Sequence, residues 1–271
     1  MNFGVKFFEI LDSTMETPTL YGWFHIMWLA ISICAAVVLC YLYKKGIIKN
    51  VRAVLLTVSI TIIVLEVYKL LNFGMSYSDG LEYNFPWGSF PWQFCSTPMY
   101  VSLIAGLTKG KVHDFCCSFL ATFAVFAGAA VMIYPDSVFI PTIGINIQTM
   151  ICHGSMITMG IFLYYTNSAK TKLTTLLKGA AVFSICVVIA EILNEVGRVT
   201  GLTEEHYFNM FYISRHEDPH LPVYSIIQQN VSCYPLCLAI YIIGFTLAAG
   251  IILLIAMGIK KLSAKLKKKE N

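Results

Sequence analysis

Residues 231–258 read VSCYPLCLAIYIIGFTLAAGIILLIAMG, a run of 28 residues that contains no Asp, Glu, Lys or Arg. About 20 apolar residues in an α-helix are enough to cross the hydrocarbon core of a bilayer. Lipid offers no hydrogen-bond partner to the backbone, so such a run is expected to be helical. The run also lacks the polar–apolar alternation of membrane β-barrel strands. The stretch therefore predicts a transmembrane helix in an all-α membrane protein.

Six further apolar runs of similar length precede this one. Together they predict a polytopic membrane protein with seven transmembrane helices, at about 22–43, 51–72, 90–108, 114–134, 147–166, 177–198 and 231–258. The whole chain is 57% hydrophobic and only 13% charged, with a mean hydropathy of +0.70. A soluble domain carries about 25% charged residues, so the composition argues against a soluble protein. We expect one transmembrane domain over 1–271.

The distribution of basic residues predicts the orientation in the membrane. Fifteen Lys and Arg residues fall on one side of the predicted helices and three on the other; Lys69 lies within a span and is not counted. Cytoplasmic loops carry the excess of Lys and Arg, so the basic side is predicted to be cytoplasmic. The N-terminus is then outside, and the basic tail 259–271 is in the cytoplasm.

Polar side chains inside the apolar runs are the best indication of a site. An ionised group at the centre of a membrane helix costs roughly 2.5–3.5 kcal/mol, so it needs a compensating role. With the predicted orientation, these side chains all lie in the outer half of the membrane and suggest one polar cavity open to the outer leaflet. They are Glu66, Lys69, Gln93, Cys95, Gln148, His153, Glu191, Asn194 and Glu195.

Each of these residues also has a structural interpretation. Glu66 and Lys69 are three residues apart on one helix and can form an ion pair, which we favour over catalysis. Glu191 and Asn194 share a helix face and either line the cavity or lie at the water interface. For His153 the alternative is a hydrogen bond between helices.

The segment that contains Cys95 is unusual for the start of a transmembrane helix. Residues 90–98 read FPWQFCSTP, so that Pro91 and Pro98 bracket the cysteine. Proline has no backbone N–H and frees a carbonyl group of the preceding turn. A substrate oxygen could find hydrogen-bond donors at such an irregular place. The nine cysteines of the chain follow no regular spacing, so we do not expect a disulfide framework.

A cysteine and a histidine at similar depth on neighbouring helices can act as nucleophile and base. Cys95 and His153 satisfy this condition in the predicted topology. A third polar group usually orients the imidazole, and Glu191 or Asn194 are the candidates. The chain has nine cysteines and six histidines, so spacing alone also yields accidental pairs.

The long linker 199–230 is polar and rich in histidine. His206, His216 and His220, with acidic neighbours, invite a metal-site interpretation. Pro219 interrupts any helix between His216 and His220, so their rings are not held on one face. We favour a solvated loop or a lid over the cavity, and we expect no metal.

Four motifs in order carry a resemblance to a known family. They are WGSFPWQFCSTPMYVSLI at 87–104, YPD at 134–136, ICHGSMITMGIFLYY at 151–165 and EILNEVG at 191–197. Together they resemble the YwaF-like integral membrane proteins, a family that includes the eukaryotic transmembrane protein 164. The resemblance implies a seven-helix fold and acyl transfer between phospholipids, with Cys95 and His153 in the catalytic positions. Many bacterial members have a histidine where this chain has Gln93, so a second titrating group is missing there.

Two hypotheses for the function follow. The first is a membrane-embedded lipid acyltransferase or hydrolase that acts on acyl esters at the outer leaflet. Cys95 would be the nucleophile, His153 the general acid–base, and Gln93 a ligand of the substrate carbonyl or headgroup. The partners would be membrane phospholipids, with no cofactor and no nucleic acid, and the location a bacterial plasma membrane. The alternative is a non-enzymatic protein that binds or transports a small polar ligand in the same outward-facing pocket.

Overall fold

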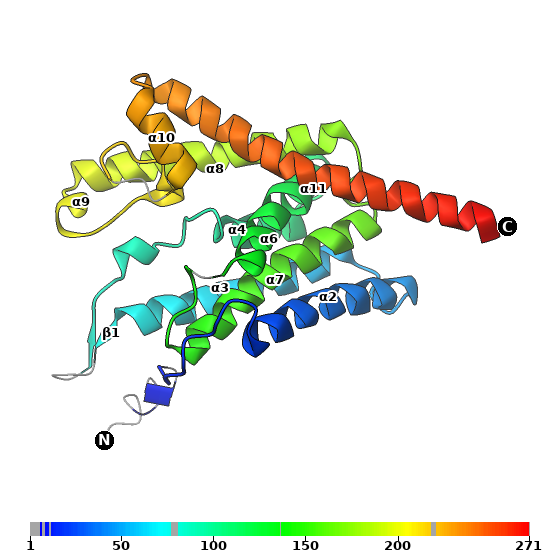
Figure 1. Cartoon of the computed structure of the whole chain (residues 1–271), viewed down its shortest axis with the longest axis horizontal. Helices are drawn as coiled ribbons and strands as arrows, with labels where there is room; N and C mark the ends of the chain where they lie inside the picture. Colours follow the sequence, from blue (N-terminus) through cyan, green and yellow to red (C-terminus); the bar gives the residue numbers. More distant parts are fainter. Residues whose placement is uncertain are drawn as a thin grey trace.

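The computed structural model describes most of the chain, namely residues 6, 9–10, 12–76, 81–135, 137–217 and 221–270. These residues are mostly helical, and Figure 1 shows the long helices running alongside one another. The α-helices are α2 (Trp23–Lys44), α3 (Val51–Gly74), α4 (Thr97–Leu107), α5 (Gly110–Phe119), α6 (Val125–Ile133), α7 (Ile143–Tyr165), α8 (Leu173–Val199), α9 (Leu202–Glu205), α10 (Pro222–Asn230) and α11 (Tyr234–Glu270). A two-residue hairpin pairs β1 (Met75–Ser76) with β2 (Glu82–Tyr83).

Within the described residues, six helices are long and apolar enough to cross a membrane. Five of them are α2, α3, α7, α8 and α11. The sixth is Gly110–Ile133, in which α5 and α6 are joined by the π-helical turn η2 (Leu120–Ala124). These helices match six of the seven predicted spans, and the chain is an all-α integral membrane protein.

The predicted span 90–108 differs, because only its second half is helical. Helix α4 has 11 residues, which at 1.5 Å per residue cover about 17 Å, roughly half of the hydrocarbon core. Pro98 lies in the first turn, where its missing N–H costs nothing and its fixed φ angle suits the start of a helix. The helix therefore begins at Thr97 and is preceded by irregular backbone. It is anchored to α3 by Ser59, whose hydroxyl donates to the Met99 carbonyl at 2.7 Å.

The centre of the bundle is formed by α5, η2, α6 and α7. Phe119, Leu120 and Phe123 are fully buried, whereas α2 and α11 expose most of their apolar side chains. Small residues allow the central helices to touch: a Cβ atom on Gly128 would lie 2.6 Å from the His153 carbonyl oxygen. The backbone of α7 at His153 is thereby fixed against α6.

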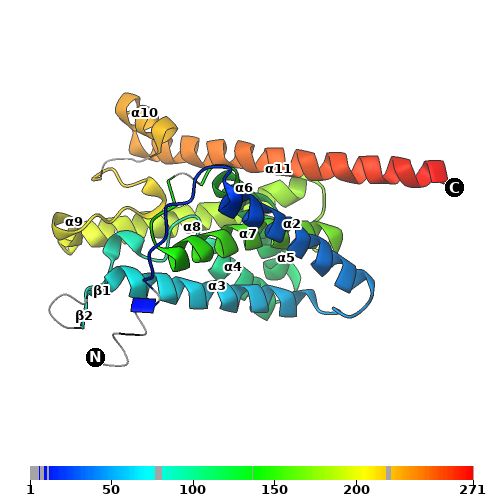
Figure 2. The same ribbon diagram turned by 60° about the horizontal axis from the view of Figure 1, so that its bottom comes forward.

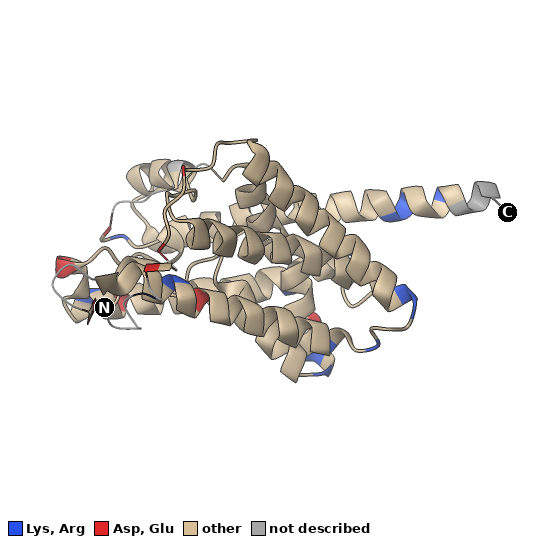
Figure 3. Ribbon diagram, turned by 90° about the horizontal axis from the view of Figure 1, so that it is seen from below, with Lys and Arg blue, Asp and Glu red and all other residues tan. Residues whose placement is uncertain are grey.

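The two ends of the bundle differ in character. Figures 1 and 2 place β1, β2, α9 and α10 at one end, which we call the loop end. The opposite end, which we call the tail end, holds the 45–50 and 166–172 connections and the C-terminal half of α11. Most of the Lys and Arg ribbon in Figure 3 lies at the tail end, and most of the Asp and Glu ribbon at the loop end.

Candidate functional site

Two irregular stretches of chain meet near the loop end of the bundle. One is the approach segment, residues 90–96, and the other is the plug segment, residues 208–214. The Gln93 side chain joins them, because its Nε2 donates to the Asn209 carbonyl and its Oε1 accepts from the Phe211 N–H, each at 2.9 Å. The Phe94 ring also packs on the Phe211 ring, with centroids 5.8 Å apart. The two segments thus satisfy each other's polar groups through Gln93 and cover each other's apolar surface through the two phenylalanine rings.

The plug segment is buried, with Asn209, Phe211 and Ile213 all at 0% exposure. Buried backbone groups need partners, and side chains from the surrounding helices supply them. Asn194 Oδ1 accepts from the Met210 N–H at 2.7 Å while its Nδ2 donates to the Met210 carbonyl at 3.1 Å. The linker 199–230 is therefore not solvated throughout; this part of it is inserted into the protein.

The backbone of the plug segment is strained. Phe211 and Tyr212 adopt φ angles of 57° and 56°, in the left-handed region that non-glycine residues seldom occupy. Such a residue costs about 1–3 kcal/mol and persists only where its surroundings enforce it. Besides Gln93, the Tyr241 hydroxyl donates to the Phe211 carbonyl at 3.1 Å. The plug is thus held in a conformation that the chain would not adopt by itself.

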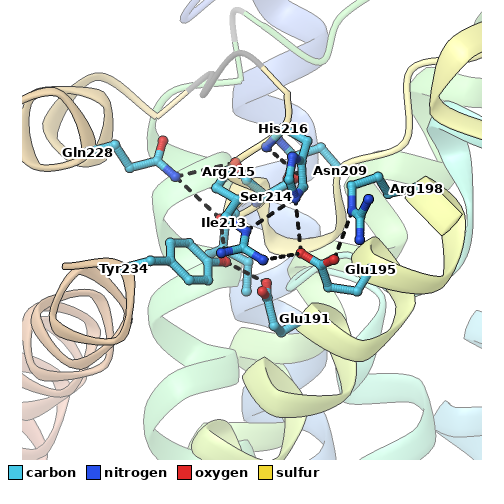
Figure 4. Close-up of polar contacts among 10 residues, drawn as sticks. All are labelled: Glu191, Glu195, Arg198, Asn209, Ile213, Ser214, Arg215, His216, Gln228 and Tyr234. Atoms are coloured by element: carbon cyan, nitrogen blue, oxygen red, sulfur yellow. Dashed lines mark hydrogen bonds and ion pairs between the residues drawn. The ribbon is translucent and has the colours of Figure 1, made fainter. Parts of the chain in front are cut away.

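A second layer of polar contacts covers the plug on the side shown in Figure 4. Tyr234 Oη lies 2.5 Å from Glu191 Oε2 and 2.9 Å from the Ile213 carbonyl. Glu195 accepts hydrogen bonds from Arg198 at 2.9 Å and Arg215 at 3.2 Å. These contacts tie the end of the plug segment to α8 and α11.

Cys95 lies in the approach segment and is partly exposed. Next to it, the Ser96 hydroxyl donates to Glu66 Oε1 at 3.3 Å, and Lys69 Nζ lies 2.6 Å from the same oxygen. The predicted Glu66–Lys69 ion pair is therefore present, and it is largely buried. The Cys95 thiol lies within electrostatic range of both charges and of Tyr212 in the plug.

His153 is buried on α7, and its Nδ1 lies 2.8 Å from the Thr149 carbonyl. A carbonyl only accepts, so in the neutral ring Nδ1 carries the proton and Nε2 keeps its lone pair. Nε2 has no hydrogen-bond partner among the described residues. The orienting bond predicted from Glu191 or Asn194 is instead supplied by Thr149, because those two side chains are engaged elsewhere.

Two adjacent residues of α7, Cys152 and His153, interact electrostatically with residues near Cys95. Cys152 packs with Ile62 and Met99, and its thiol lies within electrostatic range of Cys95 and the ion pair. His153 lies within electrostatic range of Lys69. Cys95 and His153 thus both interact electrostatically with Lys69 of α3.

Other residues that were predicted to form the site have different roles in the structure or lie outside the described residues. Gln93 uses both polar atoms for the plug segment rather than presenting them to a ligand. His216 Nε2 lies 3.1 Å from Glu195, and among the described residues no group of three His, Cys, Asp or Glu is arranged to hold a metal. Asp136, Asp218 and His220 lie outside the described residues. The buried plug was missed, although the apolar run YFNMFYI at 207–213 inside a polar linker is a signal for it.

Comparison with known proteins shows to which family the chain belongs. No curated protein and no solved structure matches the chain significantly. The model of one sequence family, described as the TMEM164 family, matches residues 20–258. That range includes the approach segment, the plug segment and the long helices, apart from the part of α11 after residue 258. The chain therefore belongs to the TMEM164 family of membrane proteins.

Proposed function

We propose that the protein is a membrane-embedded lipid acyltransferase or thioester-forming hydrolase, with Cys95 as nucleophile and His153 as general acid–base. The observation that supports this most is the setting of Cys95. Cys95 is a partly exposed residue on irregular backbone, next to Ser96, whose hydroxyl donates to the buried Glu66–Lys69 pair. The neighbouring helix α7 carries a histidine whose Nε2 is free to take a proton.

In the proposed reaction the Cys95 thiol gives its proton to His153 Nε2, and the sulfur attacks the acyl carbonyl carbon of a phospholipid. A C–S bond forms and the ester C–O bond breaks. His153 returns the proton to the leaving alkoxide, which departs as a lysophospholipid. An acceptor hydroxyl or water then attacks the thioester, so that the acyl group leaves and the thiol is regenerated. No cofactor takes part in these steps.

The lipid substrate fits the proposed depth of the site. Cys95 lies on the approach segment, two residues before the first residue of α4. An ester of an outer-leaflet phospholipid lies just beneath the headgroups and reaches this level by lateral diffusion. In this account Gln93 positions the plug segment against the approach segment, and a ligand reaches Cys95 beside that contact.

We propose seven crossings of a bacterial plasma membrane, in which the approach segment and α4 together make the third. An even number of crossings would place the N-terminus and the lysine-rich tail on one side, against the fifteen-to-three division of basic residues. A reporter fused after Asn271 should be active only in the cytoplasm, and one inserted before Leu81 only outside. Activity of both on the same side would contradict the seven crossings.

The function is tested with purified protein in vesicles of phosphatidylethanolamine and phosphatidylglycerol. One lipid carries a labelled acyl chain, and a lysophospholipid serves as acceptor. We expect the label to appear on the acceptor, or as free fatty acid, at a rate that depends on the protein. Lipid binding without either product is the result expected of a non-enzymatic binding protein, and it would overturn the proposal.

A further inference from the structure

Asn209 in the plug segment has one amide atom with a partner and one without. Its Oδ1 accepts from the Ser214 N–H at 2.9 Å, whereas its Nδ2 is buried and makes no hydrogen bond in the described structure. Exchanging the two atoms does not help, because Nδ2 would then face the Ser214 N–H, and both are donors. The unpaired group is therefore the N–H donor.

A buried donor without a partner costs free energy, and each such group in a native protein needs an explanation. The other groups of this kind include Trp28 Nε1 on α2, Tyr164 Oη in the last turn of α7 and Tyr224 Oη on α10. Asn209 differs from these because its own backbone is bonded to the approach segment. Its carbonyl accepts from Gln93, two residues before Cys95.

A second observation, an electrostatic interaction, connects the plug segment with Cys95. Tyr212, three residues after Asn209, lies within electrostatic range of the Cys95 thiol. The hydrogen bond from Gln93 to the Asn209 carbonyl and the electrostatic interaction of Tyr212 with Cys95 thus place Asn209 in the part of the plug that meets the approach segment. It is a hydrogen-bond donor that a ligand with an acceptor oxygen would satisfy.

We propose that Asn209 Nδ2 donates a hydrogen bond to the acyl carbonyl oxygen of a lipid ester bound at Cys95. The inference rests on the proposed function and adds a residue to it. When the thiol sulfur adds to the carbonyl carbon, negative charge develops on that oxygen, and a preorganised donor stabilises it. Removing one such donor typically lowers the rate about 100- to 1,000-fold.

Asn209→Asp tests the role of the Nδ2 donor separately from that of the Oδ1 acceptor. It keeps the size and the acceptor for the Ser214 N–H but removes the Nδ2 donor. Asn209→Ala, whose side chain is neutral and has no donor, is the second variant in case the buried carboxylate prevents folding. Asn146→Asp is the matched control, because Asn146 is also buried, and its Oδ1 and Nδ2 are both bonded to the Ile140 backbone at 3.0 and 2.7 Å.

The binding measurement uses a phospholipid in which a ¹³C-labelled ketone replaces the ester, so that no acyl transfer is needed. In nanodiscs with Cys95→Ala protein, we expect a population of the ketone to show a lowered infrared C=O stretching frequency. Adding Asn209→Asp or Asn209→Ala should remove that population, and adding Asn146→Asp should leave it. With Asn209→Asp it should return at acidic pH, because a protonated carboxyl is again a donor.

An unchanged spectrum in both Asn209 variants would overturn the inference and would leave an ordered water as the partner of Nδ2. Absence of the shifted population in the parent protein would overturn it as well. The test is independent of the proposed reaction. A shifted carbonyl without acyl transfer would contradict the reaction but not the Asn209 contact, whereas transfer without the shift would contradict only the contact.

Discussion

Replacing Cys95 by serine should lower acyl transfer by about 10³-fold or more while leaving the fold intact, because a serine hydroxyl is far less acidic than a thiol. His153→Ala should lower the rate by about 10²–10⁴-fold, the usual contribution of a general acid–base. A nucleophile and its base act as a unit, so the double variant should be little slower than the slower single one. The rates are measured in the vesicle assay with labelled lipid.

The controls are two cysteines that lie outside the proposed site. Cys34 and Cys233 are both exposed, so Cys34→Ser and Cys233→Ser should transfer acyl groups at the unaltered rate. Equal losses in all three serine variants would mean a general effect on the protein. Full activity of Cys95→Ser with normal expression would rule out the thioester mechanism.

Replacing either Glu66 or Lys69 alone should destabilise the protein by about 3–5 kcal/mol, because an unpaired charge is then left in a largely buried place. Their side chains are only 7% and 17% exposed. Exchanging the two residues should restore part of the loss, since the charges pair again. The restoration is incomplete because the Ser96 hydroxyl loses the Glu66 oxygen that it now binds. Thermal unfolding in detergent measures these differences.

A second ion pair in the same protein provides the comparison. Asp114 and Lys178 pair between α5 and α8, but their side chains are 43% and 33% exposed. An exposed pair contributes about 0–1 kcal/mol, so Asp114→Asn should change the stability little. Normal unfolding temperatures for the Glu66 and Lys69 single variants would show that the pair is not structural. Loss of activity in the same variants would then assign it to catalysis.

The long helices were predictable because the bilayer imposes their length and composition. Residues 231–258 contain no charge over more than the span of the hydrocarbon core, and the structure makes them helical from Tyr234 onward. At 90–96 the prediction of a helix is wrong, because apolar composition carries no information on backbone geometry. Pro98, which lies in the first turn of α4, is the residue that indicates where this helix begins.

Contacts within one helix were also predictable, and those between distant segments were not. Glu66 and Lys69 pair because three residues bring them onto one face. The bond from His153 to Thr149 joins residues four apart, so the same rule would have predicted it. Gln93 and Asn209 are 116 residues apart, and no local pattern indicates that the approach and plug segments meet.

Mass spectrometry of the protein after a brief reaction with labelled phospholipid tests the central claim most directly. Acid quenching preserves a thioester, and proteolysis then locates the acyl group. We expect the acyl mass on the peptide that contains Cys95, its removal by neutral hydroxylamine, and its absence from Cys95→Ser protein. An acyl group on another cysteine, or product formation with no acylated peptide at any time, would contradict the account.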